Sequence, residues 1–211
     1  MSATNAGANG AIALAMTGAS GAQYGLRLLE CLIRAQRTVY LMLSKPAQVV
    51  IGMETDFSLP ARPLDIEKTL RDRFDAAQGQ VRVYGTEEWT APVASGSSAP
   101  AAMVVCPCSM ATAAGIASGS SRNLIERAAD VMLKERRPLI LVPRETPFSI
   151  IHLENLLRAA RAGATVLPAN PGFYQKPKRI EELVDFVVAR ILDHLHVAHA
   201  LAPRWAEENE A

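Results

Sequence analysis

The sequence lacks several features that would point to a particular partner or compartment. No apolar run approaches the ~18–20 residues that a membrane-spanning helix needs. The formal net charge of the 211 residues is only +1, so we expect neither nucleic acid nor a membrane surface as a partner. Residues 1–10 contain no basic residue and no apolar stretch, which predicts a disordered N-terminal lead rather than a secretory signal.

Cysteine is scarce as well. The chain has three cysteines, Cys31, Cys106 and Cys108, and an odd, small number argues against a disulfide framework. It fits a reducing compartment, and we therefore expect a cytoplasmic protein. Cys106 and Cys108 flank one proline, so they form no CxxC redox motif, and no histidine lies near them to complete a zinc site.

A magnesium-binding cluster of carboxylates is also missing. Asp72 and Asp75 have a suitable spacing, but Arg71 and Arg73 alternate with them, which is typical of a salt-bridged helix surface. The sequence has no Asp-rich motif of the kind that holds a diphosphate through a metal ion. We therefore predict a site that works without metal.

What the chain does have is a regular alternation of short apolar runs and helical patterns. The runs are rich in valine and leucine, as in parallel strands that are buried on both faces. Strands are predicted at residues 11–16, 38–43, 81–84, 101–106, 139–143 and 165–168. The alternation of strands and helices predicts one α/β domain over residues 11–195. Its fold would be Rossmann-like (flavodoxin-like), with a doubly wound and mainly parallel sheet. Residues 196–211 are predicted to extend over the domain or over a neighbouring subunit.

In such a sheet, ligands bind beyond the carboxyl ends of the strands. The first predicted strand is followed by small residues, Gly18, Ala19, Ser20 and Gly21. They would let the backbone approach an anion, and the next helix would supply N–H groups and the positive end of its dipole. The turn is neither a Walker A loop nor a GxGxxG motif, and a tight turn without a ligand explains it equally well.

Hydroxyl side chains follow two further strands. Ser44 stands before Pro46 at a predicted helix start, where an ordinary N-cap is the simpler reading. The loop PCSMAT at residues 107–112 carries Ser109 and Thr112 three positions apart. If a helix begins there, both hydroxyls can contact one phosphate. A phosphate site made of hydroxyls and amides, without the lysine of a P-loop, fits FMN better than ATP.

Several charged or phenolic side chains indicate a second site. Arg144 and Glu145 follow the strand at 139–143, either as site residues or as a surface ion pair of little energetic value. Arg190 lies at the edge of the apolar side of the last helix, where it needs an anionic partner unless its side chain reaches water. Tyr174 lies in a loop, where a phenol can bind an oxyanion or only pack.

The helix predicted at residues 123–136 is amphipathic. Its apolar side chains share one arc, while Glu126, Arg127, Asp130 and Lys134 share the opposite arc. Arg127 and Lys134 lie nearly in line along that helix. From spacing alone we favour a solvated charged face.

Read in order, several segments resemble the UbiX/Pad-type flavin prenyltransferases. They are MTGASGAQYG, the Ser44-Lys45 step, ETD at 54–56, SGS at 95–97, PCSMAT, ERAADVMLKERRPLILVPRETP at 126–147, and PANPGFY. The resemblance implies a homododecamer that transfers a dimethylallyl group from dimethylallyl monophosphate to N5 of reduced FMN, followed by a bond to C6. The product, prenylated FMN, would be used by a UbiD-type decarboxylase, such as that of ubiquinone biosynthesis.

The resemblance also assigns residues. Ser20 near the flavin N5, Glu54 as an acid or base near the prenyl group, Lys134, and Glu145 sharing a proton with the phosphate would be catalytic. FMN would be held by Gly18, Ala19, Ser20, Ser44, Ser109, Met110, Ala111, Thr112 and Arg144. The substrate would contact Arg127, Lys134, Arg144, Glu145, Tyr174, Arg190 and Trp205, some of them from adjacent subunits.

Three other functions remain open. One is an FMN-dependent decarboxylase of cysteinyl peptides, which would be expected to carry an asparagine motif and a histidine at the flavin. Here the loop is PCSMAT, and the histidines all lie late in the chain, at His152, His194, His196 and His199. Direct decarboxylation of an aromatic acid is the second. A non-catalytic flavin carrier is the third, although a carrier needs no second phosphate site.

Overall fold

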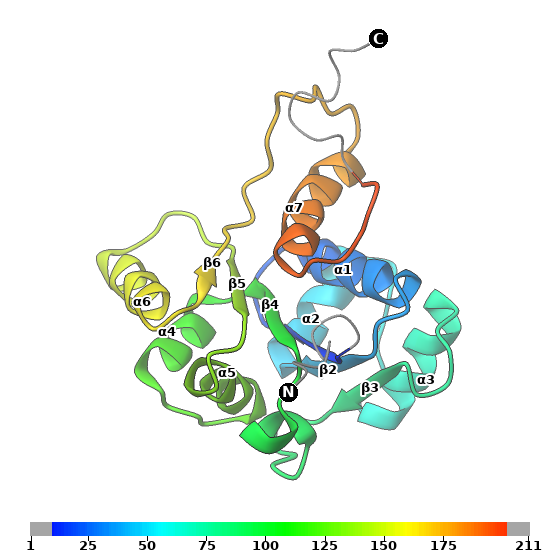
Figure 1. Ribbon diagram of the computed structural model, residues 1–211. Helices are drawn as coiled ribbons and strands as arrows, with labels where there is room; N and C mark the ends of the chain where they lie inside the picture. Colours follow the sequence, from blue (N-terminus) through cyan, green and yellow to red (C-terminus); the bar gives the residue numbers. More distant parts are fainter. Residues whose placement is uncertain (1–9, 202–211) are drawn as a thin grey trace, which may run out of the picture.

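The computed structural model describes residues 10–201, and within them six parallel strands form one sheet in the order β3-β2-β1-β4-β5-β6 (Figure 1). This is the strand order of doubly wound dinucleotide-binding sheets, whose switch point lies between β1 and β4. The predicted α/β fold is therefore confirmed. The strands are β1 (Ile12–Met16), β2 (Val39–Leu43), β3 (Val81–Tyr84), β4 (Ala102–Cys108), β5 (Leu139–Pro143) and β6 (Thr165–Val166).

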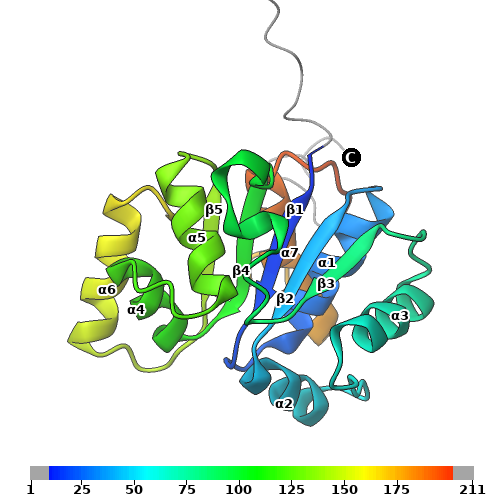
Figure 2. The same cartoon turned by 90° about the horizontal axis from the view of Figure 1, so that it is seen from below.

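Helices cover both faces of the sheet (Figures 1 and 2). One face packs against α1 (Ala22–Arg34), α2 (Lys45–Glu54), α3 (Pro63–Phe74) and α7 (Ile180–His194). The other packs against α4 (Met110–Ser118), α5 (Leu124–Lys134), α6 (Ile150–Arg161) and the short 3-10 turn η1 (Pro92–Ala94), which η2 (Gly96–Ser98) follows.

The strands form the core because their side chains alternate between these two layers. Leu14 and Met16 pack into the first layer, while Ala13 and Ala15 pack into the second. All seven residues of β4 are buried. Burial on both faces is why these strands appear in the sequence as uninterrupted apolar runs rather than as apolar–polar alternation.

Three predicted segments differ from the structure, and one helix was not predicted. β4 continues through Pro107 and Cys108, two residues beyond its predicted end, and β6 is shorter than predicted. The serine-rich segment at 95–98, which suggested a flexible loop, contains η2. Helix α6 had no counterpart among the predicted elements, because Ile150 and Ile151 are exposed and blur its apolar periodicity.

After β6, the chain at 167–179 runs away from the sheet before α7 returns to pack against α1 (Figure 1). Arg27 on α1 and Asp185 on α7 join these helices through an ion pair of 2.7 Å. Val197, beyond α7, is buried against the same layer. Most of the predicted N-terminal lead, and the tail from residue 202 with Trp205, lie outside the described residues. In residues 10–201, no helix combines the length and apolar character that crossing a bilayer requires.

Candidate active site

Hydrogen bonds between loops hold the carboxyl ends of β1, β2 and β4 together. The N–H of Ser44 donates to the carbonyl of Met16 at 3.1 Å, which ties the start of α2 to β1. The hydroxyl of Thr17 donates to the carbonyl of Pro107 at 2.9 Å and accepts the N–H of Ser109 at 2.7 Å. The turn after β1 therefore lies between the starts of α2 and α4.

The turn after β1 lies so close to α2 that position 18 must be glycine. A Cβ added at Gly18 would collide with the Cβ of Pro46, so a side chain there would push the two loops apart. Gly21 begins α1 with a φ of 101°, in the left-handed region that favours glycine. Small residues in this turn thus have a structural reason that is independent of any ligand.

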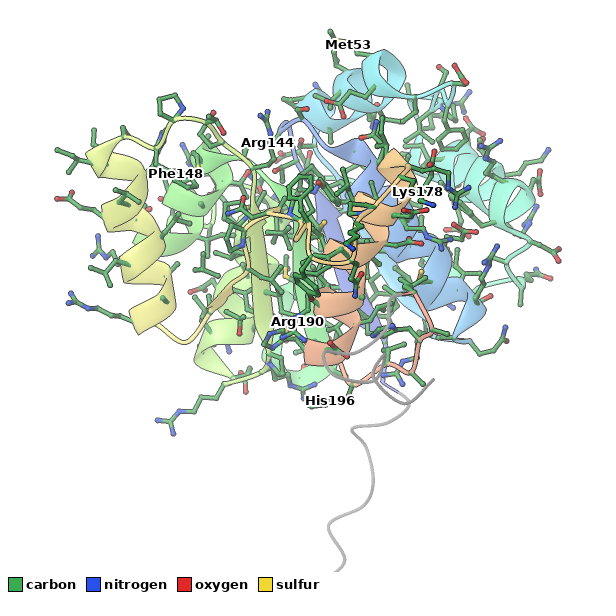
Figure 3. All side chains as sticks on the ribbon, turned by 90° about the horizontal axis from the view of Figure 1, so that it is seen from above. Met53, Arg144, Phe148, Lys178, Arg190 and His196 are labelled. Atoms are coloured by element: carbon green, nitrogen blue, oxygen red, sulfur yellow. The ribbon has the colours of Figure 1, made fainter. Side chains whose placement is uncertain are left out.

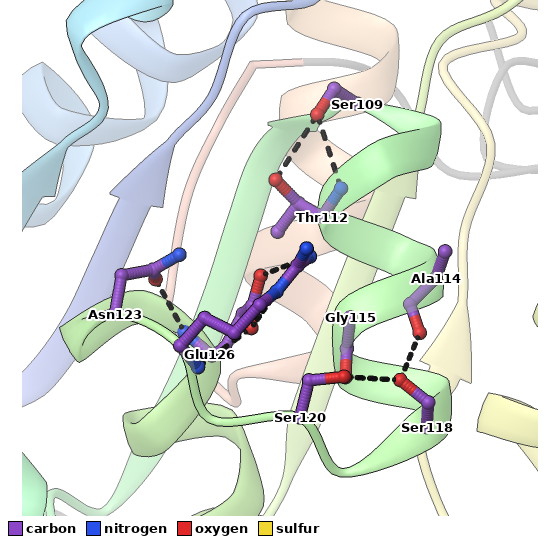
Figure 4. Close-up of polar contacts among 9 residues, drawn as sticks. Ser109, Thr112, Ala114, Gly115, Ser118, Ser120, Asn123 and Glu126 are labelled. Atoms are coloured by element: carbon purple, nitrogen blue, oxygen red, sulfur yellow. Dashed lines mark hydrogen bonds and ion pairs between the residues drawn. The ribbon is translucent and has the colours of Figure 1, made fainter.

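Two helix starts at this edge carry hydroxyl groups. The side chain of Ser44 accepts the N–H of Ala47 at 3.1 Å and caps α2. The side chain of Ser109 accepts the N–H of Thr112 at 3.3 Å and caps α4, and the two hydroxyl oxygens are 3.1 Å apart (Figure 4). Met110 is buried, whereas Ala111 beside it is exposed. Hydroxyls and positive helix ends suit a phosphate.

The start of α1, in contrast, is already occupied by a carboxylate. Oε2 of Glu54 accepts the N–H of Gly21 at 2.8 Å and the N–H of Ala22 at 2.9 Å. Partial burial raises the pKa of Glu54, but the hydroxyl of Ser20, the two N–H groups and Arg144 together bring it below its ordinary value. The prediction that the N–H groups of α1 meet a ligand anion needs correction, because the anion they bind here is the side chain of Glu54.

Arg144 connects the end of β5 to the same turn. Its Nε donates to the carbonyl of Ser20 at 3.2 Å, while its own N–H donates to the carbonyl of Cys108 at 3.4 Å. Glu145 accepts the N–H of Thr146 at 3.1 Å. These hydrogen bonds join Arg144 and Glu145 to backbone atoms and not to each other, which differs from the surface ion pair that was the alternative prediction. We call Gly18, Ser20, Ser44, Glu54, Ser109, Thr112 and Arg144 the carboxyl-edge group.

A second set of site residues lies elsewhere, and we call Arg127, Lys134 and Arg190 the cation group. On α5, Arg127 donates to the carbonyl of Ala94 at 3.1 Å and pairs with Asp130 at 3.0 Å. Lys134 ends α5 shortly before β5 begins, and thus lies toward the amino ends of the strands. A Cβ on Gly96 would be 2.9 Å from its Nζ, which places Lys134 against η2.

The partner that Arg190 was predicted to need is on its own helix. Its Nη1 is 2.7 Å from Asp193, and its side chain is 55% exposed. Figure 3 places Arg144 at the end of the sheet where α2 carries Met53, and Arg190 toward the opposite end, near His196. Tyr174 packs edge-on against Phe186, with ring centroids 5.6 Å apart. Within one chain, Lys134 and Arg190 therefore lie away from the carboxyl-edge group.

The prediction that Glu126 faces solvent with Arg127 and Lys134 is wrong. It is 3% exposed, and its carboxylate accepts the N–H of Arg122 at 2.9 Å and Nη2 of Arg122 at 3.0 Å (Figure 4). A Cβ on Gly115 would collide with this carboxylate. The helical periodicity of α5 cannot reveal this pocket for Glu126. The pocket is formed by the turn at 118–122 and by Gly115, which has no side chain, on α4.

The structure also assigns a contact to Thr17, which the sequence analysis left without a role. The one sequence signal is that a polar side chain directly follows an apolar strand and precedes the glycine turn. For metal ions, residues 10–201 contain no group of three or more His, Cys, Asp or Glu side chains that could hold one.

Comparisons with known proteins show the family to which this chain is similar. Residues 2–192 match the model of the Flavoprotein family. Flavin prenyltransferase UbiX of Pseudomonas aeruginosa is 59% identical over 198 residues, which cover 94% of this chain and 95% of that protein.

Two solved structures extend the likeness to three dimensions. AnUbiX (PadA1) in complex with FMN and dimethylallyl pyrophosphate has 43% identity and a TM-score of 0.83, over 93% of this chain and 97% of that one. A dodecameric FMN-dependent UbiX-like decarboxylase from Escherichia coli O157:H7 has 40% identity and a TM-score of 0.81, over 92% and 98%. In both cases the likeness spans nearly the whole chain.

Proposed function

Because the chain belongs to the flavin prenyltransferase family, we propose that it transfers the dimethylallyl group of dimethylallyl monophosphate to N5 of reduced FMN and then closes a ring at C6. The observation that carries this proposal is the carboxyl-edge group. There, two hydroxyl-capped helix starts flank a turn in which Gly18 has no room for a side chain. The arrangement suits a mononucleotide phosphate.

The residues present fit FMN. Ser44, Ser109 and Thr112, with the N–H groups of Met110 and Ala111, would hold its phosphate. Gly18, Ala19, Ser20 and Arg144 would contact the remainder of the molecule. When bound, the reduced flavin supplies the electron-rich nitrogen that attacks the allylic carbon. The protein then acts by orienting two reactants and excluding water from them.

Proton movement is assigned to Ser20 and Glu54. The hydroxyl of Ser20 is hydrogen-bonded to the Glu54 carboxylate. Burial raises the pKa of Glu54, but its hydrogen bonds and Arg144 lower it more, so the pKa is below its ordinary value. At neutral pH, Glu54 is therefore ionised and can accept a proton through Ser20. Glu145 would share a proton with the departing phosphate, and Lys134 would stabilise the charge that develops there.

The cation group must reach the carboxyl-edge group from other copies of the chain. We propose a homododecamer, the assembly of the Escherichia coli relative, in which Arg127, Lys134, Arg190 and Tyr174 complete a neighbour's site. Exposed apolar side chains support contacts between copies. Ile150 is 75% exposed and Ile151 is 68% exposed on α6, and such patches are typical of interfaces. Trp205 would join from outside the described residues.

The remaining parts of the proposal concern the setting. The product would serve a UbiD-type decarboxylase, and the reaction would need no metal. The three cysteines are free, as in a reducing compartment, which favours the cytoplasm. The second candidate function is direct decarboxylation, favoured by the name of the Escherichia coli relative.

One experiment separates these functions. The protein is incubated without oxygen with reduced FMN and either dimethylallyl monophosphate or the diphosphate, and the flavin mass is measured. A gain of one C5 unit with the monophosphate is expected. No gain, together with carbon dioxide from an aromatic acid, supports the decarboxylase. FMN binding with neither product indicates a carrier.

A further inference from the structure

We propose that Thr17 is a positioning residue that fixes the phosphate-binding loop at the start of α4. This inference rests on the proposed function, because it requires FMN to bind with its phosphate at Ser109 and Thr112. Thr17 itself does not contact the phosphate in this proposal. It acts through Ser109.

Thr17 is saturated with hydrogen bonds although it lies in the apolar core, at 2% exposure. Its hydroxyl donates to the carbonyl of Pro107 at 2.9 Å and accepts the N–H of Ser109 at 2.7 Å. Its own N–H donates to the same Pro107 carbonyl at 3.1 Å, and its carbonyl accepts the N–H of Ala19 at 2.8 Å. One residue thus joins the glycine turn after β1 to the end of β4.

The bond to Ser109 sets how α4 begins. Ser109 is the N-cap of α4, and its side chain contacts both the N–H and the hydroxyl of Thr112. Because Thr17 holds the N–H of Ser109, it fixes the peptide group that precedes Ser109, whose hydroxyl in turn contacts Thr112. Loss of this bond leaves a donor without its partner at the edge of the core.

The equivalent link to α2 depends on no side chain. There, the N–H of Ser44 donates to the backbone carbonyl of Met16, which every residue at that position would provide. Of these two hydrogen-bonded links, only the one to α4 is made by a side chain of the turn after β1. Substitution of Thr17 should consequently affect ligands that carry a phosphate and spare those that lack one.

The test compares FMN with riboflavin, which has the same ring and ribityl chain but no phosphate. Dissociation constants are measured by flavin fluorescence for the full chain and for Thr17→Val, which keeps the shape but removes the hydroxyl. We expect FMN binding to weaken about tenfold and riboflavin binding by less than about twofold. Thr17→Ser, which keeps the hydroxyl, should restore the preference for FMN.

Thr69→Val is the matched control, because its hydroxyl bonds within α3, on an exposed surface. It should leave both constants unchanged. If Thr17→Val does not fold, Thr17→Cys takes its place, and a wild-type ratio of FMN to riboflavin affinity in that variant overturns the proposal. Equal weakening of both ligands, or no weakening, also overturns it. If the unchanged chain binds no FMN, the proposed function fails instead.

Discussion

The carboxyl-edge group and the cation group differ in how their charged side chains are satisfied. Glu54 and Arg144 bond to backbone atoms of the turn after β1, far away in the sequence. Arg127 and Arg190 pair with acids one helical turn away, and both pairs are part-exposed at the surface. The first group is thus organised by the fold of one chain. In the second, only Arg127 has a bond to distant backbone, to the carbonyl of Ala94, and its other bonds and those of Arg190 are weak local ion pairs that a phosphate could replace.

The largest expected effect tests the cation group. Lys134→Met should lower the rate of prenyl transfer by ~10²–10³, because a charge facing the leaving phosphate is lost, while FMN affinity stays unchanged. The rate is followed by flavin mass at fixed times. Lys68→Met on α3 is the control and should keep full activity. Equal loss of FMN binding in Lys134→Met would contradict the separation of the two groups.

Co-expression of two impaired variants tests directly whether the two groups come from different copies of the chain. Glu54→Gln removes the ionised carboxylate of the carboxyl-edge group, and Lys134→Met damages the cation group. If each site combines the two groups from different copies, co-expressed chains should regain activity at about a quarter of their sites. Each variant alone is the control. Activity no greater than that of the separate variants would show that both groups act within one chain.

A smaller effect concerns the link between the regions. Glu126 lies on α5 with Arg127 and Lys134 of the cation group, but its pocket is formed at Gly115 on α4, whose N-cap is Ser109. Glu126→Gln should lower the free energy of unfolding by about 1–3 kcal/mol, because the bonds to Arg122 lose their charge. Urea denaturation measures this change. Glu135→Gln, at an exposed ion pair, should change it by less than about 0.5 kcal/mol.

The smallest effect is a pH dependence of the carboxyl-edge group. The pKa of Glu54 is lower in the folded chain than its ordinary value of 4.5, so its bonds stabilise the fold above that pH. This stabilisation is lost as pH falls through the lowered pKa. Below pH 4.5, Glu54→Gln should therefore lose less stability than the unchanged chain. Thermal unfolding of both proteins over a series of pH values measures this difference. The same loss of stability below pH 4.5 in both proteins would contradict the role of Glu54 at the start of α1.

Local patterns predicted much of the fold. β5 at Leu139–Pro143 has its predicted bounds, because burial on both faces leaves a continuous apolar run. The N-cap Ser44 was also predicted, since capping acts over three residues. Helix α6 was not, because apolar residues such as Ile150 and Ile151 are exposed while Leu156 and Ala159 are buried, so its apolar residues do not mark one face.

The site was predicted less completely for a related reason. Ser109 and Thr112 are close in sequence, so their spacing indicates their proximity. The contact of Glu54 with Gly21 joins residues that are distant in the sequence, and the burial of Glu126 depends on a glycine in another helix. The proposed contact of Lys134 with a phosphate would depend on other copies of the chain, which no local pattern describes.

The carboxylate at the start of α1 has a consequence for nucleotide selectivity. In doubly wound sheets that bind dinucleotides, the helix after the first strand receives the pyrophosphate at its N-terminus. Here that position belongs to Glu54, which bonds to the N–H groups of Gly21 and Ala22. NAD or FAD would bring two negative phosphates against a fixed negative charge. The chain thus keeps the dinucleotide-binding strand order, but the position of Glu54 argues against a pyrophosphate at the start of α1.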